Sequence, residues 1–343
     1  MKKILSHVIA VIIIISAFTP LVSAQNVYSV KRSASIMENV RAFLDCVDDR
    51  KEIVSSVNLF NSSDTIEAIF YQLSYSGYVV ASYKDGHIIE YSPDDLSESL
   101  VEISKAQRLY YGGVLLFCIK FNDKYQDIIT EEIIDGNSFY SKEYCDTVPE
   151  LPFGTAFNNN QTRDAVLSPP INYGSASGGY YCTITGIANL LQYYKDYFNA
   201  DVYSGNVTNY SGMRSALCNN HYIYNGPLFL SEAISNHIYN FVNYNGLYSY
   251  LHRNDVTTYY VSIHGASLSN VVQRIGTYAR PVLLTINTSS LNSQVSGMHI
   301  VLCYGYWETS TTTYYIVNDT WGHNSVYICA DDVPPGYELL ELS

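Results

Sequence analysis

A thiol and an imidazole open two strongly patterned segments that lie far apart in the chain. Cys182 follows Gly-Gly-Tyr-Tyr and precedes a helix-like run, and His299 begins a strand-like run. A free thiol is only a few per cent thiolate at neutral pH, but a neighbouring imidazole and a helix N-terminus convert it into a nucleophile. The two residues therefore predict nucleophilic catalysis, provided that folding brings the sulfur and the ring together.

A third polar segment, Asn-Asp-Thr-Trp-Gly at 318–322, follows the next strand-like run. If the two strands pair antiparallel, His299 and Asp319 lie near the same end of the sheet. Asp319 is then expected to accept the second ring N–H of His299 and to fix its tautomer. Trp321 is expected to shield that hydrogen bond from water. Strict alternation turns Asn318 to the opposite face, so it is the weaker candidate for this role.

Each of these residues also has an ordinary structural interpretation. Cysteine is among the most buried residue types, so Cys182 taken alone is better explained as a core thiol. The chain has 8 histidines, and His264 and His323 rival His299. His299 is preferred because it opens the strand whose expected partner leads to Asp319. Cys118 and Cys303 lie in apolar runs and are interpreted as core residues.

The run after Cys182 predicts a helix with one buried face, because Ile184, Ile187 and Ala188 recur at helical spacing. Gly186 inside this helix costs about 1 kcal/mol relative to Ala, which predicts close packing there. The rest of the second half is expected to contain a loop over 199–224, helices over 231–244 and 267–278, and strands over 282–286, 299–306, 314–318 and 326–329. Helices followed by a sheet indicate α+β layering.

The first half predicts a small, mostly antiparallel α+β unit with an acidic surface. The spacing of Ile36, Val40, Phe43 and Leu44 predicts a helix within 33–47. Strands are expected over 65–73, 77–83, 87–92 and 114–121, with a helix over 96–106 and a turn at 110–113. Residues 136–178 are poor in periodicity and rich in Asn, Ser, Pro and Gly, which is typical of a linker followed by a loop.

Residues 1–24 have a positive start, an apolar core and a small-x-small end, as in a secretory signal peptide. A retained membrane anchor is the alternative, although the apolar stretch is near the lower limit for a span. We expect a secreted bacterial protein, free or associated with the cell surface. The net charge of -13 argues against nucleic acid as a partner.

The second half holds 23 of the 34 tyrosines, which indicates either a groove for extended peptide or glycan, or drift in an AT-rich genome. Seven cysteines leave at least one thiol unpaired in a secreted chain. Because no close-spaced Cys-x-x-Cys pair occurs, no zinc site is expected, and no cofactor is implied.

The segment from Cys182 to Tyr194 resembles the Cys-x-x-Thr-x-x-Ala helix of the papain-like cysteine peptidases, and within them the streptopain family. The runs over 279–284, 298–306 and 315–322 are similar to the sheet half of that family. The Asn-Asp-x-Trp-Gly ending also resembles the double-glycine leader peptidases, in which Asp is the third catalytic residue. The runs over 77–83 and 88–93 are similar to streptopain-type propeptides.

The resemblance implies a signal peptide over 1–24, a propeptide-like α+β domain over 25–145 and a papain-like peptidase domain over 146–343. One feature departs from the family, which carries a Gln shortly before the cysteine as a donor to the oxyanion. The stretch from Asn172 to Tyr181 contains no Gln. Asn172 or Gln161 is the candidate replacement, beside the Cys182 backbone N–H.

These observations favour a secreted cysteine endopeptidase made as a zymogen, with Cys182, His299 and Asp319 as its catalytic residues. Its partners are then a protein or peptide substrate and its own propeptide, with no nucleic acid and no membrane after signal cleavage. A non-catalytic binding protein that keeps the fold is the alternative. A cell-wall amidase is less favoured, because such enzymes generally have Asp-Cys-Ser-Gly where this chain has Tyr-Cys-Thr-Ile.

Overall fold

The structure, a computed structural model, describes residues 32–47, 49–94, 97–129, 131, 133–135, 163–170, 182–203, 207–219, 238–239, 242–243, 247, 250–251, 261–265, 267–287, 298–332 and 338–342. The expected signal peptide and the two candidate oxyanion residues, Asn172 and Gln161, lie outside these ranges. None of the helices found in them has both the length and the apolar character needed to cross a membrane.

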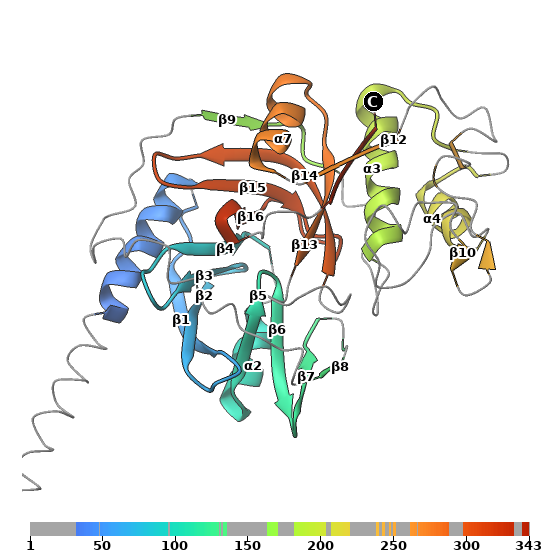
Figure 1. Cartoon of the computed structure of the whole chain (residues 1–343). Helices are drawn as coiled ribbons and strands as arrows, with labels where there is room; N and C mark the ends of the chain where they lie inside the picture. Colours follow the sequence, from blue (N-terminus) through green and yellow to red (C-terminus); the bar gives the residue numbers. More distant parts are fainter. Residues whose placement is uncertain are drawn as a thin grey trace, which may run out of the picture.

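The protein is a mixed α/β structure with few helices, in which most of the described strands form one large sheet and two short strands over 238–239 and 242–243 form a separate pair (Figure 1). The sheet runs in the order β12-β17-β13-β14-β15-β16-β4-β3-β2-β1-β5-β6-β7-β8, with β9 added beside β14. The described pairings within it are antiparallel except for β1 with β5. This architecture is consistent with the expected α+β class.

The strands of the first half are β1 (Ile53–Phe60), β2 (Ile66–Leu73), β3 (Tyr78–Ser82), β4 (Ile88–Ser92), β5 (Leu109–Gly113), β6 (Leu116–Phe121), β7 (Lys124–Asp127) and β8 (Ile133–Asp135). A helix over residues 32–46 precedes them, and α2 (Ser97–Ala106) lies between β4 and β5.

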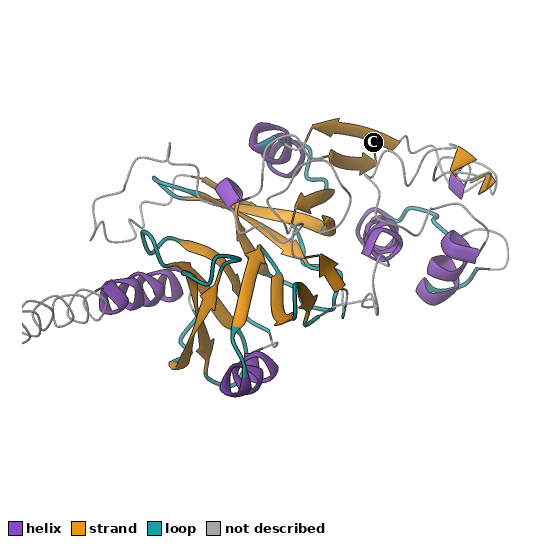
Figure 2. Ribbon diagram, turned by 60° about the horizontal axis from the view of Figure 1, so that its bottom comes forward, coloured by secondary structure: helices purple, strands orange, loops and turns teal. Residues whose placement is uncertain are grey.

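The second half contains β9 (Arg163–Val166), α3 (Cys182–Phe198), α4 (Tyr210–Asn219), β10 (Ile238–Tyr239), β11 (Val242–Asn243), β12 (Val261–Gly265), α7 (Leu268–Val272), the π-helical turn η1 (Gln273–Thr277), β13 (Val282–Asn287), β14 (Met298–Glu308), β15 (Thr313–Asn318), β16 (Val326–Cys329), the 3-10 turn η2 (Ala330–Asp332) and β17 (Glu338–Leu342). Helices lie on the periphery of the strands, as the turned view shows (Figure 2).

Strands β3 and β4 are buried on both faces, because apolar side chains cover each side of them. Val79 and Ala81 pack with the helix over 32–46, whereas Tyr78 and Val80 pack in a second cluster that includes Leu100 of α2. The sequences of these strands are therefore mostly apolar on both faces and do not alternate between apolar and polar residues.

The two halves of the chain are joined by a strand pair. Tyr327 and Ile328 of β16 pair antiparallel with Tyr91 and Glu90 of β4. The domain boundary expected after residue 145 lies outside the described residues, and on either side of it the sheet is continuous. Two of the apolar clusters contain residues from both halves.

Most of the expected elements are confirmed, including the helices over 33–47, 96–106 and 267–278 and the strands β2–β4, β6 and β13–β16. Four expectations are wrong. The turn at 110–113 is part of β5, the loop over 199–224 contains α4, the loop over 136–178 contains β9, and the helix over 231–244 contains β10 and β11. Pairing with neighbours explains two of these: β5 pairs with β1 and β6, and β9 pairs with β14. Helix α4 forms because Met213 and Leu217, four residues apart, both enter the apolar cluster around α3.

Candidate active site

Cys182 is the first residue of α3, as the sequence predicts. A backbone hydrogen bond from Ile300 reaches its thiol, and Ile300 directly follows His299 in β14. Burial raises the pKa of the Cys182 thiol, and backbone hydrogen bonds from Ile300 and Thr183 only partly oppose it. The expected lowering of this pKa by the helix N-terminus is therefore outweighed by burial, so the thiol is protonated at neutral pH.

The helix that carries Cys182 lies unusually close to β14. A Cβ added at Gly186 would meet Ile300 Cγ2 at 2.8 Å, which is closer than side-chain carbons approach one another. The close packing predicted from this glycine is therefore confirmed. The same contact sets the distance between α3 and β14, the strand that begins with Met298 and His299.

The His299 ring is buried and held on two sides. Its Nε2–H donates to the backbone carbonyl of Asp319 at 2.6 Å. The Trp321 ring stacks on it, with centroids 3.7 Å apart and an interplanar angle of 17°. The proton therefore lies on Nε2, and Nδ1 keeps its lone pair. Burial lowers the pKa of His299 to about 4, so the ring is neutral at neutral pH.

The Asp319 carboxylate does not bind the His299 ring, contrary to the expected arrangement. It accepts hydrogen bonds from the backbone N–H groups of Trp321 and His323, at 2.8 and 2.9 Å, and from His323 Nδ1 at 2.5 Å. The reason lies in the turn, in which Thr320 and Gly322 have positive φ angles of 61° and 117°. This turn folds the carboxylate back over its own loop and leaves the Asp319 carbonyl to face the histidine.

Asn318 faces α3, on the side that strand alternation predicts. Its Oδ1 accepts from Asn189 Nδ2 at 3.1 Å, and its Nδ2 donates to Asn324 Oδ1 at 2.7 Å. Asn189 belongs to α3, so this pair of amides ties the helix of Cys182 to the end of β15. Asn189 and Asn324 were not anticipated from the sequence. The available signal was an amide side chain, Asn189, between apolar residues on either side in the helix.

The two rival histidines occupy different positions. His323 pairs with the Asp319 carboxylate. His264 lies on β12, which β17 and β13 separate from β14 in the sheet. His299 is thus the histidine whose backbone neighbour contacts Cys182. No hydrogen bond joins the Cys182 sulfur to the His299 ring among the contacts of the described residues.

The arrangement combines a protonated thiol, a neutral imidazole with a free Nδ1 lone pair, and a carbonyl and an indole that hold the imidazole. Such a set can transfer a proton from sulfur to Nδ1 once the two atoms approach one another. Asp319 and Trp321 act on the ring from the same loop, and Thr320 ties that loop to β14 by donating from Oγ1 to the carbonyl of Ile300 at 3.0 Å.

Comparisons with known proteins do not assign a function to this chain. No protein-family model matches the sequence, and no curated protein matches it. The chain is similar to a solved structure of a mutant prointerpain A fragment from Prevotella intermedia, with a TM-score of 0.42 and 12% identity, covering 84% of this chain and 98% of that one. A likeness at this level carries no functional argument, so the functional assignment must come from the geometry around Cys182 and His299.

Proposed function

We propose that this chain is the precursor of a secreted cysteine peptidase, with a papain-like second half and a propeptide-like first half. The observation that carries the proposal is the backbone contact between Ile300 and the Cys182 thiol at the start of α3, directly beside His299. The carbonyl and indole that hold the His299 ring add support, because a general base must be oriented as well as near.

In the proposed reaction, His299 Nδ1 takes the proton of the Cys182 thiol and the thiolate attacks the peptide carbonyl carbon. The carbonyl oxygen becomes an oxyanion, toward which the Cys182 backbone N–H donates at the helix start. Collapse of this intermediate breaks the C–N bond, and the amine leaves with the proton from His299. Water then hydrolyses the thioester, giving a carboxylate and returning the proton to the thiol.

In this proposal Asp319 is a positioning residue. Its carbonyl holds the proton on Nε2 of His299, and its carboxylate holds the loop that carries Trp321. The charge of Asp319 also contributes, after burial and Glu90, to raising the pKa of Tyr78 in the first half of the chain. The site loop therefore lies near the first half, which supports a role for residues 25–145 in holding the site latent.

The neutral thiol and imidazole also support latency. An active thiolate–imidazolium pair needs a thiol pKa below that of its histidine, whereas here burial raises the pKa of Cys182 and lowers that of His299. Cleavage in the segment 136–150, followed by movement of the first half, is the proposed activating event. Partial exposure of the site would bring both pKa values back toward one another.

The direct test compares Cys182→Ala and His299→Gln with Cys218→Ala, which alters another partly buried cysteine in the same half. Self-processing of the full chain and hydrolysis of casein are measured. We expect both activities to vanish in the first two variants and to persist in Cys218→Ala. Casein cleavage that survives Cys182→Ala would end the proposal.

The alternative is a secreted binding protein that keeps the fold without catalysis, and the same neutral pair of side chains favours it. An epoxide-type thiol inhibitor distinguishes the two. Labelling of Cys182 faster than of free cysteine, after the first half is cut and removed, supports the peptidase. Labelling no faster than free cysteine, both in the full chain and after removal of the first half, supports the binding protein.

A further inference from the structure

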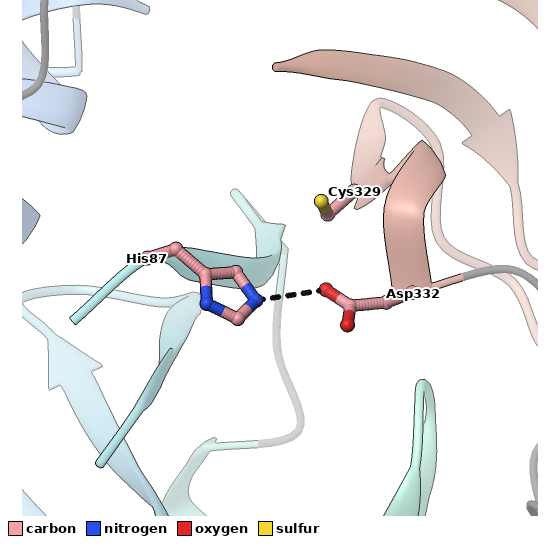
Figure 3. A group of neighbouring side chains, drawn as sticks. All are labelled: His87, Cys329 and Asp332. Carbon is pink, nitrogen blue, oxygen red and sulfur yellow. Dashed lines mark hydrogen bonds and ion pairs between the residues drawn. The ribbon is translucent and has the colours of Figure 1, made fainter. Parts of the chain in front are cut away.

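Three potential metal ligands meet at the junction of the two halves. His87, Cys329 and Asp332 each offer one ligand atom, and these atoms all lie within 4.8 Å of one another (Figure 3). His87 precedes β4, Cys329 ends β16, and Asp332 ends η2. The first and last of them are 245 residues apart in the sequence, which explains why no spacing motif indicates the group.

The histidine ring is already oriented as a ligand. Asp85 Oδ1 lies 2.7 Å from His87 Nδ1, so the other ring nitrogen, Nε2, faces Asp332 Oδ2 at 3.1 Å. A carboxylate on the far nitrogen of a metal-binding histidine is the usual arrangement, because it fixes the ring and increases its basicity. Donor atoms around a tetrahedral zinc ion are about 3–4 Å apart, so only small movements would close the group around an ion.

The burial of the group suits a bound ion. Cys329 and Asp332 are 1% and 7% exposed. The His87 side chain is 22% exposed, which leaves a route of entry on that side. An ion held there would be screened from water on the sulfur and carboxylate side, where its charge interactions are strongest.

We propose that His87, Cys329 and Asp332 form a zinc site that links the two halves of the chain. The donor set selects the metal, because a thiolate and an imidazole suit zinc, whereas calcium and magnesium require oxygen ligands. Three protein ligands leave the fourth position to water. Binding replaces the proton on the Cys329 thiol and the one on His87 Nε2, and both protons pass to solvent.

A bound ion would hold the two halves of the chain together. His87 lies next to β4, and Cys329 ends β16, so the ion would reinforce the β4–β16 strand pair. The metal site does not depend on the proposed peptidase activity, and it is remote in sequence from Cys182. Without metal, the His87 ring pairs with Asp85 and Asp332 as an ion pair, and this is the competing interpretation.

The test uses the full chain carrying Cys182→Ala, which removes a competing thiol and self-processing, after treatment with a chelator. Co²⁺ is added as a spectroscopic probe, and Zn²⁺ is then added in competition. We expect one equivalent of Co²⁺ to give a sulfur-to-cobalt charge-transfer absorption that Zn²⁺ abolishes. We also expect Zn²⁺ to raise the melting temperature, because it binds only the folded chain.

Two further variants and a control assign the ligands. Cys329→Ser should remove the absorption, and Asp85→Asn should weaken zinc binding by about 10- to 100-fold, as expected for a residue behind the ligand. Cys46→Ser, which changes a partly exposed cysteine outside the group, should retain both signals. If Cys329→Ser fails to fold, the Co²⁺ spectrum of the Cys182→Ala chain decides the question. Absence of the absorption there, or its persistence in folded Cys329→Ser, overturns the zinc site and leaves the ion pair.

Discussion

Replacing Gly186 by alanine tests whether α3 lies on β14 as closely as the candidate site requires. The added Cβ would stand 2.8 Å from Ile300 Cγ2 and 3.4 Å from Leu283 Cδ2. Ile300 cannot easily give way, because its side chain is 1% exposed and Cγ2 is attached directly to its Cβ. The helix and the strand must therefore separate, and the contact between the Cys182 sulfur and the Ile300 backbone must lengthen.

Two opposing effects set the size of the change in stability. Overpacking a filled core costs about 1–3 kcal/mol. Alanine in place of glycine inside a helix returns about 1 kcal/mol. The free energy of unfolding of Gly186→Ala is thus expected to fall by roughly 0–2 kcal/mol.

A matched variant removes the helix-propensity part of this estimate. Gly212 also lies in a helix, α4, but a Cβ there would meet Asn209 Oδ1 at 3.4 Å and Val207 Cγ1 at 3.6 Å, which are ordinary contacts. Gly212→Ala is therefore expected to be neutral or stabilising. The difference between the two variants in urea unfolding should be about 1–3 kcal/mol, the overpacking cost alone.

The effect on catalysis should exceed the effect on stability. A displacement of about 1 Å at a catalytic group can reduce the rate by about 100-fold. We expect peptide hydrolysis by the processed chain to fall toward that extent in Gly186→Ala and to stay unchanged in Gly212→Ala. Equal stabilisation by both alanines would refute the close approach of α3 to β14, and with it the placement of Cys182 beside Ile300.

Three further predictions concern the site loop and the junction. Asp319→Ala should lower the free energy of unfolding by about 1–3 kcal/mol for each buried donor that it leaves unpaired. Asp319→Asn should lower it less, because the amide oxygen still accepts from the backbone N–H groups of Trp321 and His323. Equal losses for the two variants in urea unfolding would show that charge, and not loop geometry, is what matters. Burial raises the pKa of Glu90 to about 8, above its value of about 4.3 in unfolded chains. The folding stability that Glu90 contributes is therefore complete below its pKa in unfolded chains and is lost as the pH rises through 8. Glu90→Gln should flatten this dependence of stability on pH, whereas the exposed control Glu102→Gln should not. After proteolysis within 136–150, the two fragments should co-elute in gel filtration and separate only in denaturant, and separation in native buffer would contradict a shared core.

The strands around the site could be predicted because their side chains obey one simple rule. In β14 the alternation sends Ile300 and Leu302 to the cluster around α3, and Val301 and Cys303 to the opposite cluster. The antiparallel pairing of β14 with β15 then brings the 319–322 segment to His299. Gly186 was equally informative, since a glycine inside an apolar helix indicates a close neighbour.

Other features depend on partners that no local pattern encodes. Strand β9 exists because the edge of β14 offers hydrogen bonds to Ala165 and Val166. The acceptor for His299 is a backbone carbonyl, which every residue carries, so the sequence pointed to the Asp319 carboxylate instead. The group of His87, Cys329 and Asp332 is assembled by the β4–β16 pair, and each member looks isolated along the chain.

Contacts around the β4–β16 pair determine whether a cut between the halves releases the first half. Phe43 of the first half packs against two aromatic rings of the second, with its ring centroid 5.9 Å from that of Trp307 and 5.5 Å from that of Tyr314. Trp307 and Tyr314 are buried in a cluster that includes Tyr91. Proteolysis within 136–150 breaks one covalent bond but none of these contacts, and loss of the first half would expose these rings to water at a cost proportional to their area. Cutting and activation are therefore separable steps, and the second of them requires the β4–β16 pair to open.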